Sequence, residues 1–259
     1  MDKLPQSQDD IATQEPVEGY VRYVLGRNRL VRRVFDACLI TEIVIVLGDL
    51  LLNYLHLLPW RLIRRVVNIT REDSVANFFS SVQFLLCAGV LWLIFFREQA
   101  DSPKPMNWGW AILAIIFMYL GMDDATRLHE RIGGTFEQYM DTIQKVDTFF
   151  PTYAWQLVFA PVLLGIGLYI LYFVFRRLKD WHLKRMILGG LVCFAVAVGL
   201  DALEGMNIPA LETHRVLHYM KLVEELLEMF GTTLLLVTFV EVLLPKTQPL
   251  VVNIEPELS

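Results

Sequence analysis

The chain has 259 residues, of which 55% are hydrophobic, and its formal net charge at pH 7 is -5. Soluble proteins average roughly 45–50% apolar residues, so this composition exceeds that of an ordinary soluble domain. The negative charge supplies none of the basic field that phosphate backbones require, which predicts no nucleic-acid partner. The three cysteines lie in apolar runs without a CxxC spacing, a pattern typical of small buried side chains rather than of a disulfide or a thiolate metal site.

The hydrophobic residues come in blocks of about twenty, the length that a helix needs to cross a hydrocarbon core of about 30 Å. Continuous apolar runs without a period of two exclude a β-barrel, and lipid offers no partner to free backbone amides. The predicted fold class is therefore all-α, a polytopic transmembrane helix bundle of about six spans. The predicted spans are Ala37–Leu58, Val75–Phe96, a third that runs from beyond Asn107 to Gly133, Pro151–Phe175, Leu183–Leu203 and a last one from Pro209 to Pro245.

Three regions follow from this division. Residues 1–34 are predicted to be a disordered, basic cytoplasmic segment, residues 35–245 the six-helix transmembrane domain, and residues 246–259 a flexible tail. The first thirty-odd residues contain no apolar stretch typical of a cleavable signal peptide. Ser74 is the expected N-cap of the second span, and Pro59 ends the first.

Lysine and arginine in the short loops predict the orientation. Basic residues precede the first span and occupy the second and fourth loops, so with six spans they share one side, which we assign to the cytoplasm together with both ends of the chain. The expected location is the inner, or plasma, membrane of a bacterium, with membrane lipids as partners. The first outer loop opposes this assignment with a basic group that could belong to an interfacial helix: Arg61, Arg64, Arg65 and Arg71.

The polar residues of the spans gather toward the outer side. In the first span Glu42, Asp49 and His56 are seven residues apart and Asn53 is four from Asp49, so they share one helix face. A charge facing lipid costs several kcal/mol, and this face should therefore point into the bundle. Other spans add polar residues at the same depth, namely Asp123, Asp124, His129, Glu130, Asp201, Glu204, His214, His218, Lys221, Glu224, Glu225 and Glu228. The inner halves are nearly all apolar apart from Glu42 and Glu241.

This pattern predicts a metal site that opens to the outer leaflet. His214 and His218 are four residues apart and can address one ion from one helix face. The candidate metal ligands are His129, His214, His218, Asp49, Asp124, Asp201, Glu204 and Glu228. Zinc suits the mixed histidine and carboxylate set, whereas carboxylates alone suit calcium or a pair of iron or manganese ions. A metal-activated water, with Asp123, Glu130 or Glu225 as general base, would hydrolyse a lipid or another amphiphilic small molecule.

Other interpretations remain open. Buried Asp49, Asp201 and Glu225 could exchange protons or cations in a transporter. In a non-catalytic subunit or assembly factor the carboxylates would form ion pairs with Arg127, Arg131 and Lys221. The glutamates from Glu224 onward could also be a solvated helix start. Haem between two of the histidines His56, His129, His214 and His218 is a fourth interpretation.

Two resemblances accompany these motifs. The string GMDDATRLHERIGG, from Gly121 to Gly134, with the later Glu-Glu-x-x-Glu string, resembles bacterial multi-pass membrane proteins of unknown function. That resemblance implies that Asp123, Asp124, His129, Glu130, Glu225 and Glu228 act together. The His214/His218 pair also resembles the pair in alkaline-ceramidase-like membrane hydrolases, which implies zinc held by that pair and His129, although Ala125 stands where those proteins have a serine.

Overall fold

The computed structural model describes residues 21–25, 27–55, 57, 59–71, 73–126, 128, 131–132, 154–204, 214–244 and 250–254. Side-chain surroundings are described for these residues except 21–25, 154–160, 204, 214–215 and 250–254.

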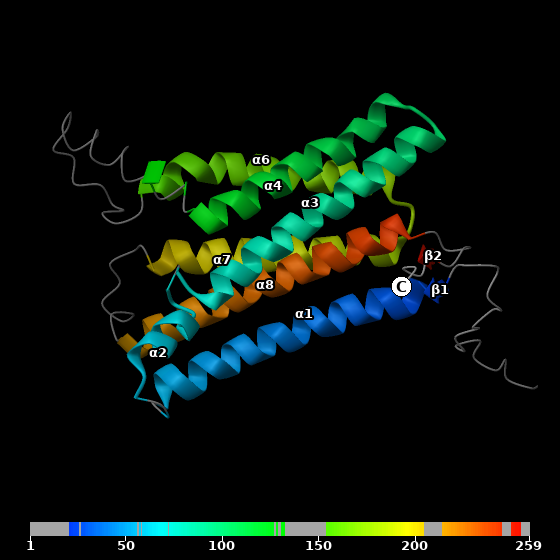
Figure 1. Cartoon of the computed structure of the whole chain (residues 1–259). Helices are drawn as coiled ribbons and strands as arrows, with labels where there is room; N and C mark the ends of the chain where they lie inside the picture. The colour runs from blue at the N-terminus through cyan, green and yellow to red at the C-terminus, as the bar shows by residue number, and fades with distance from the viewer. Residues whose placement is uncertain are drawn as a thin grey trace, which may run out of the picture.

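Long helices dominate the described structure (Figure 1). The long ones are α1 (Arg27–Asp49), α3 (Val75–Asp101), α4 (Trp108–Thr126), α6 (Ala154–Arg177), α7 (Trp181–Glu204) and α8 (His214–Leu243). Short elements join them: a π-helix at Leu50–Tyr54, the helix α2 (Arg61–Val67) and a 3-10 helix at Pro105–Asn107. Helices that follow one another run in opposite directions, as expected when successive spans cross a membrane.

Four segments of the described part are long and apolar enough to cross a membrane: Val75–Asp101, Pro105–Thr126, Trp181–Leu203 and Val216–Leu243. This confirms that the chain has helices able to cross a membrane, as predicted. The number of six spans stays a prediction. The predicted start of the second span is confirmed in detail, because the Ser74 side chain accepts a hydrogen bond from Asn77 N at 3.3 Å, as an N-cap does.

The first helix begins earlier than predicted. The apolar block suggested a start near Ala37, but α1 begins at Arg27, inside the region predicted to be disordered. The missed part is rich in arginine and lacks an apolar window. It is tied to the bundle by Arg27, whose Nη2 lies 2.6 Å from Glu241 Oε1 on α8. Leu30, Val31 and Val34 of this segment also pack against the apolar core, so contacts with the rest of the bundle hold it in place.

A short β-ribbon was not predicted. The strand β1 (Val21–Leu25) pairs antiparallel with β2 (Leu250–Ile254), so that Val21 lies opposite Ile254 and Leu25 opposite Leu250. Figure 1 shows the ribbon beside the start of α1 and the end of α8. The pairing joins residues more than two hundred positions apart, which no local pattern reveals.

The helix α8 lies at the centre of the packing. It contacts α1, α3 and α7, and α3 packs in turn along α4. Their shared core is apolar and includes the fully buried side chains of Leu91, Trp110, Phe117 and Phe239. Large apolar side chains also cover the outside of the bundle, as on Val44 and Leu164, where a soluble protein would carry polar residues.

Two glycines let α7 and α8 approach closely. A Cβ added at Gly190 would lie 2.9 Å from the backbone oxygen of Gly231, and one at Gly231 would lie 3.0 Å from the oxygen of Gly190. Small residues that allow such backbone contact are typical of packed membrane helices.

We expect Gly190→Ala to force these helices apart and to lower the free energy of unfolding by about 1–3 kcal/mol. Gly189→Ala is the matched control, because its Cβ would meet Leu234 Cδ1 at an ordinary 3.5 Å. Thermal unfolding of both variants in detergent checks this. Equal melting temperatures for the two variants would contradict the role given to the close approach.

Candidate functional site

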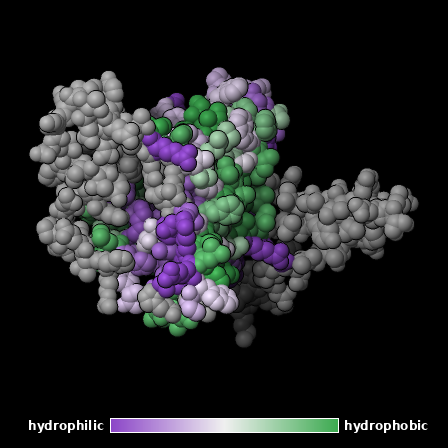
Figure 2. Space-filling view, turned by 60° about the vertical axis from the view of Figure 1, so that its left-hand side comes forward, coloured by the Kyte–Doolittle hydropathy of each residue, from purple (hydrophilic) through white to green (hydrophobic). Residues whose placement is uncertain are grey.

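Polar side chains from several helices meet at one end of the bundle. This end holds the last turns of α1, α4 and α7, the first turns of α3 and α8, and the short helix α2 (Figure 1). Figure 2 brings this end forward and shows hydrophilic surface gathered in one area beside a long hydrophobic surface.

Among the described acids at this end, Asp49 is the most completely enclosed, with no exposed surface. Its Oδ1 accepts hydrogen bonds from the Ile69 backbone N–H at 3.1 Å and from Asn53 Nδ2 at 3.0 Å. Its Oδ2 lies 3.0 Å from Nε2 of His218. The π-helix begins at the next residue, and such local widening of a helix is frequent at functional sites. Asp49 therefore links α1, the loop after α2, and α8.

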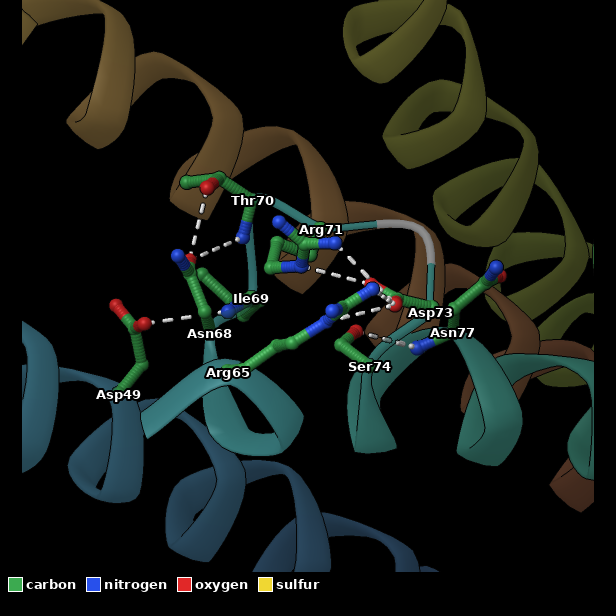
Figure 3. A network of polar contacts seen from close by, with 9 residues as sticks. All are labelled: Asp49, Arg65, Asn68, Ile69, Thr70, Arg71, Asp73, Ser74 and Asn77. Atoms are coloured by element: carbon green, nitrogen blue, oxygen red, sulfur yellow. Dashed lines mark hydrogen bonds and ion pairs between the residues drawn. The ribbon is translucent and has the colours of Figure 1, made fainter. Parts of the chain in front are cut away.

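The loop from α2 to α3 positions the backbone amide that binds Asp49 (Figure 3). Asn68 Oδ1 accepts hydrogen bonds from both the backbone N–H and the hydroxyl of Thr70, which closes a tight turn around Ile69. On the outer side of the same loop, Arg71 and Arg65 bind the Asp73 carboxylate at 2.7 and 2.8 Å. These guanidinium groups hold the pKa of Asp73 well below its usual range.

His218 lies on the first turns of α8, and its ring is oriented by Asp49. The adjacent Tyr219 ring lies 5.7 Å from that of Tyr54, which packs the start of α8 against the π-helix. A histidine whose Nε2 donates to a buried carboxylate keeps Nδ1 as its acceptor nitrogen. The pair is thus arranged as a carboxylate that orients a base.

A second group of polar side chains surrounds Lys221, one helical turn further along α8. Lys221 Nζ lies 2.6 Å from Glu224 Oε1, 3.8 Å from Glu225 Oε1 and 3.9 Å from Asp201 Oδ1 on α7. All four side chains are largely buried, Glu224 most of all at 4% exposure. The interpretation of these glutamates as a solvated helix start is therefore wrong for Glu224.

Further carboxylates extend this group. The electrostatic neighbours of Glu225 include Glu228 on its own helix and Asp124 on α4. Asp124 Oδ2 accepts a hydrogen bond from the Ser81 hydroxyl of α3 at 2.8 Å. We call the six residues Asp124, Asp201, Lys221, Glu224, Glu225 and Glu228 the carboxylate cluster. The buried Oε2 of Glu224 has no hydrogen-bond partner in the described structure.

The structure thus brings several of the predicted site residues together. Asp49 joins His218, and Asp201 and Glu225 lie beside Lys221. Asp124 and Glu228 are neighbours of Glu225. Asp123 is half-buried and lies near Tyr119 on its own helix. His129 and Glu130, and the side chains of His56, Glu204 and His214, lie outside the described residues.

The sequence did not reveal two of the groups that hydrogen-bond to the buried acids. The backbone amide of Ile69 cannot be inferred from residue type, since any residue carries one. Thr233 binds Glu42 and Gln83 deeper in the bundle, and its hydroxyl looked like part of an ordinary apolar span. The polar residues at the start of α3, which include Ser81 and Gln83, were the feature of the sequence that could have indicated polar partners inside the bundle.

The donors favour some metals over others. Among the described residues, no three histidine, cysteine, aspartate or glutamate side chains converge closely enough to hold a metal ion. The carboxylate cluster offers oxygen donors and the unpartnered Oε2 of Glu224, which suit calcium, manganese or iron, while His218 is bonded to Asp49. By the chemistry of its donors alone, an oxygen-rich set suits a hard divalent cation better than zinc.

The fold and the site define a multi-helix membrane protein with a buried carboxylate cluster at one end of its bundle. The chain belongs to the family of the domain of unknown function DUF8692, whose model matches residues 37–243. This agrees with the resemblance to a family of unknown function. No curated protein and no solved structure matches the chain.

Proposed function

We propose that this protein is a six-span inner-membrane protein whose carboxylate cluster binds a divalent cation near the outer leaflet, and that it hydrolyses a lipid or another amphiphile there. The observation that carries the proposal is the gathering of largely buried carboxyl groups from α4, α7 and α8 in the carboxylate cluster, together with the unpartnered Glu224 Oε2. A divalent cation would supply the partner that this oxygen lacks.

The β-ribbon supports the topology. Because β1 precedes α1 and β2 follows α8, their pairing places the two strands on the same side of the bundle. An even number of crossings is required for this, and six satisfies it. The arginines before the first span favour the cytoplasm as that side. The carboxylate cluster, at the opposite end, would then face the outer leaflet.

The Asp49–His218 pair supports hydrolysis. Asp49 fixes the imidazole through Nε2, as an orienting carboxylate does for a general base, so Nδ1 is the nitrogen that would accept a proton from water. His218, Lys221, Glu225 and Glu228 lie on one face of α8, which places this base on the same side as the carboxylate cluster. A bound cation would supply Lewis-acid activation of that water. The apolar outside of the bundle is suited to an amphiphilic substrate.

Metal content tests the proposal. We expect protein purified without chelators to carry a stoichiometric divalent ion, measured by elemental analysis, and Glu225→Gln and Glu228→Gln to lose most of it. Asp36→Asn is the control, because Asp36 is an exposed carboxylate on α1 that pairs only with Arg32, also exposed. Wild-type protein without stoichiometric metal, or variants that retain it, would contradict the proposal.

A further inference from the structure

We propose that Glu42 forms a second, interior site with Gln83 and Thr233, in which the Glu42 carboxyl binds one exchangeable proton and acts as a neutral acid. This site lies in the middle of the bundle, away from the carboxylate cluster, and no predicted catalytic or metal-binding role includes these residues. The proposal does not depend on a metal ion in the carboxylate cluster.

The three side chains form a closed triangle of contacts between α1, α3 and α8. Thr233 Oγ1 donates to Glu42 Oε1 at 2.6 Å, Gln83 Nε2 donates to Thr233 Oγ1 at 2.7 Å, and Gln83 Nε2 lies 3.3 Å from Glu42 Oε1. Glu42, Gln83 and Thr233 have no exposed surface. The site is therefore preformed and shielded from solvent.

The hydrogen-bond balance of this triangle lacks a donor. Glu42 Oε2 and Gln83 Oε1 are both buried acceptors without a partner in the described structure, and the hydroxyl of Ser80, one turn before Gln83, has none either. A proton on Glu42 Oε2 supplies an O–H donor to this layer and makes the carboxyl neutral. One proton thus supplies a hydrogen-bond donor and neutralises the buried carboxylate.

No cationic group stands against Glu42 among the described contacts. On its own helix the nearest titratable group is Cys38, whose thiol lies within hydrogen-bonding reach of Thr233 and Gln83, and on α3 it is Cys87, next to Cys38. On α8 the flanking acids are Glu228 and Glu241, five and eight residues from Thr233, and Glu241 pairs with Arg27. An ionised Glu42 would be an isolated charge in an apolar core, whereas a protonated one would not.

Apolar layers separate Glu42 from the polar groups at both ends of the bundle. Along α1, Asp49 is seven residues away, about 10 Å at the helical rise. In the other direction the described core is closed by Leu91, Ile94, Leu236 and Val240, all buried. Toward Asp49 the buried apolar cluster of Ile45, Ile69, Ala76 and Met229 lies between, so apolar side chains enclose Glu42 in both directions along the bundle.

Infrared spectroscopy of the full-length protein in detergent at neutral pH tests this proposal. We expect the difference spectrum between wild type and Glu42→Gln to show the loss of a carboxylic-acid C=O band, and that band to shift when the solvent is exchanged for D2O. Glu241→Gln is the matched control: its carboxylate is paired with Arg27, so it should lose a carboxylate band instead.

Two more measurements keep the test decisive. Thr233→Val retains the acid and should shift its C=O band, because the hydroxyl donor to Oε1 is lost, even if Glu42→Gln proves unstable. Loss of a carboxylate band in Glu42→Gln would overturn the proposal, as would an acid band that does not respond to D2O. A sodium-dependent rise in melting temperature that Glu42→Gln abolishes would also overturn it, since the site would then hold an alkali cation.

Discussion

Replacing Lys221 with methionine should destabilise the protein by about 3–5 kcal/mol, the usual cost of removing one partner from a buried ion pair. Lys221 is 21% exposed and is the cation of the carboxylate cluster, in contact with Glu224, Glu225 and Asp201. Without it the carboxylates repel one another in a site that water reaches poorly. Thermal and denaturant unfolding in detergent would measure the loss.

A second substitution that restores the stability lost in Lys221→Met tests the role of Lys221 more sharply. Adding Glu224→Gln to Lys221→Met should recover much of the lost free energy, because it removes a carboxylate that the lysine had neutralised, and a double-mutant cycle gives the coupling. Lys179→Met, at an exposed position, should change stability by less than about 0.5 kcal/mol. Equal losses for the two lysines, or no recovery by Glu224→Gln, would refute the role given to Lys221.

Asp49→Ala should be the second severe substitution, with a loss of at least about 3 kcal/mol. It removes the acceptor of the Ile69 amide and the partners of Asn53 and His218, and each buried group left unpaired costs roughly 1–3 kcal/mol. Asp49→Asn should cost less, because its amide oxygen can still accept from Ile69. Asp36→Ala, at an exposed position of the same helix, is the control for stability.

Hydrogen exchange separates this local role from general destabilisation. In Asp49→Ala the amide of Ile69 should exchange faster than amides in the apolar core around Leu91, because its acceptor is gone while that core is unchanged. Uniform acceleration across the chain, with no excess at Ile69, would show that Asp49 does not position the loop after α2.

Much of the fold could be predicted from the sequence because each membrane crossing requires a block of apolar residues in a helix. Each apolar block coincides with a long helix, and the Ser74 cap was legible from residue type alone. The early start of α1 and the β-ribbon escaped, since both depend on contacts across the whole chain. At the start of α1, Arg27 forms an ion pair with Glu241 on α8, and in the β-ribbon Val21 pairs with Ile254.

The candidate site was predictable in part for the same reason. A charged group in a membrane-spanning helix needs polar partners, so Asp49 and Asp201 could be assigned to the interior of the bundle without a structure. Which partner each would meet could not be inferred: His218 pairs with Asp49, and Lys221 rather than histidine stands among the acids. Glu42 appeared in the sequence as an exception in an apolar half-span, and its meaning needed Thr233 and Gln83.

The attachment of α1 at both ends limits how the protein can move. At one end the β-ribbon and the Arg27–Glu241 pair tie α1 to α8, and at the other end Asp49 binds His218 of the same helix. Two such fastenings prevent α1 from sliding along α8 or swinging away from it. A change in protonation at Glu42, which lies between them, is then expected to be absorbed by rotation of its own side chain or those of Gln83 and Thr233, while α1 and α8 stay fixed to each other as a stiff frame.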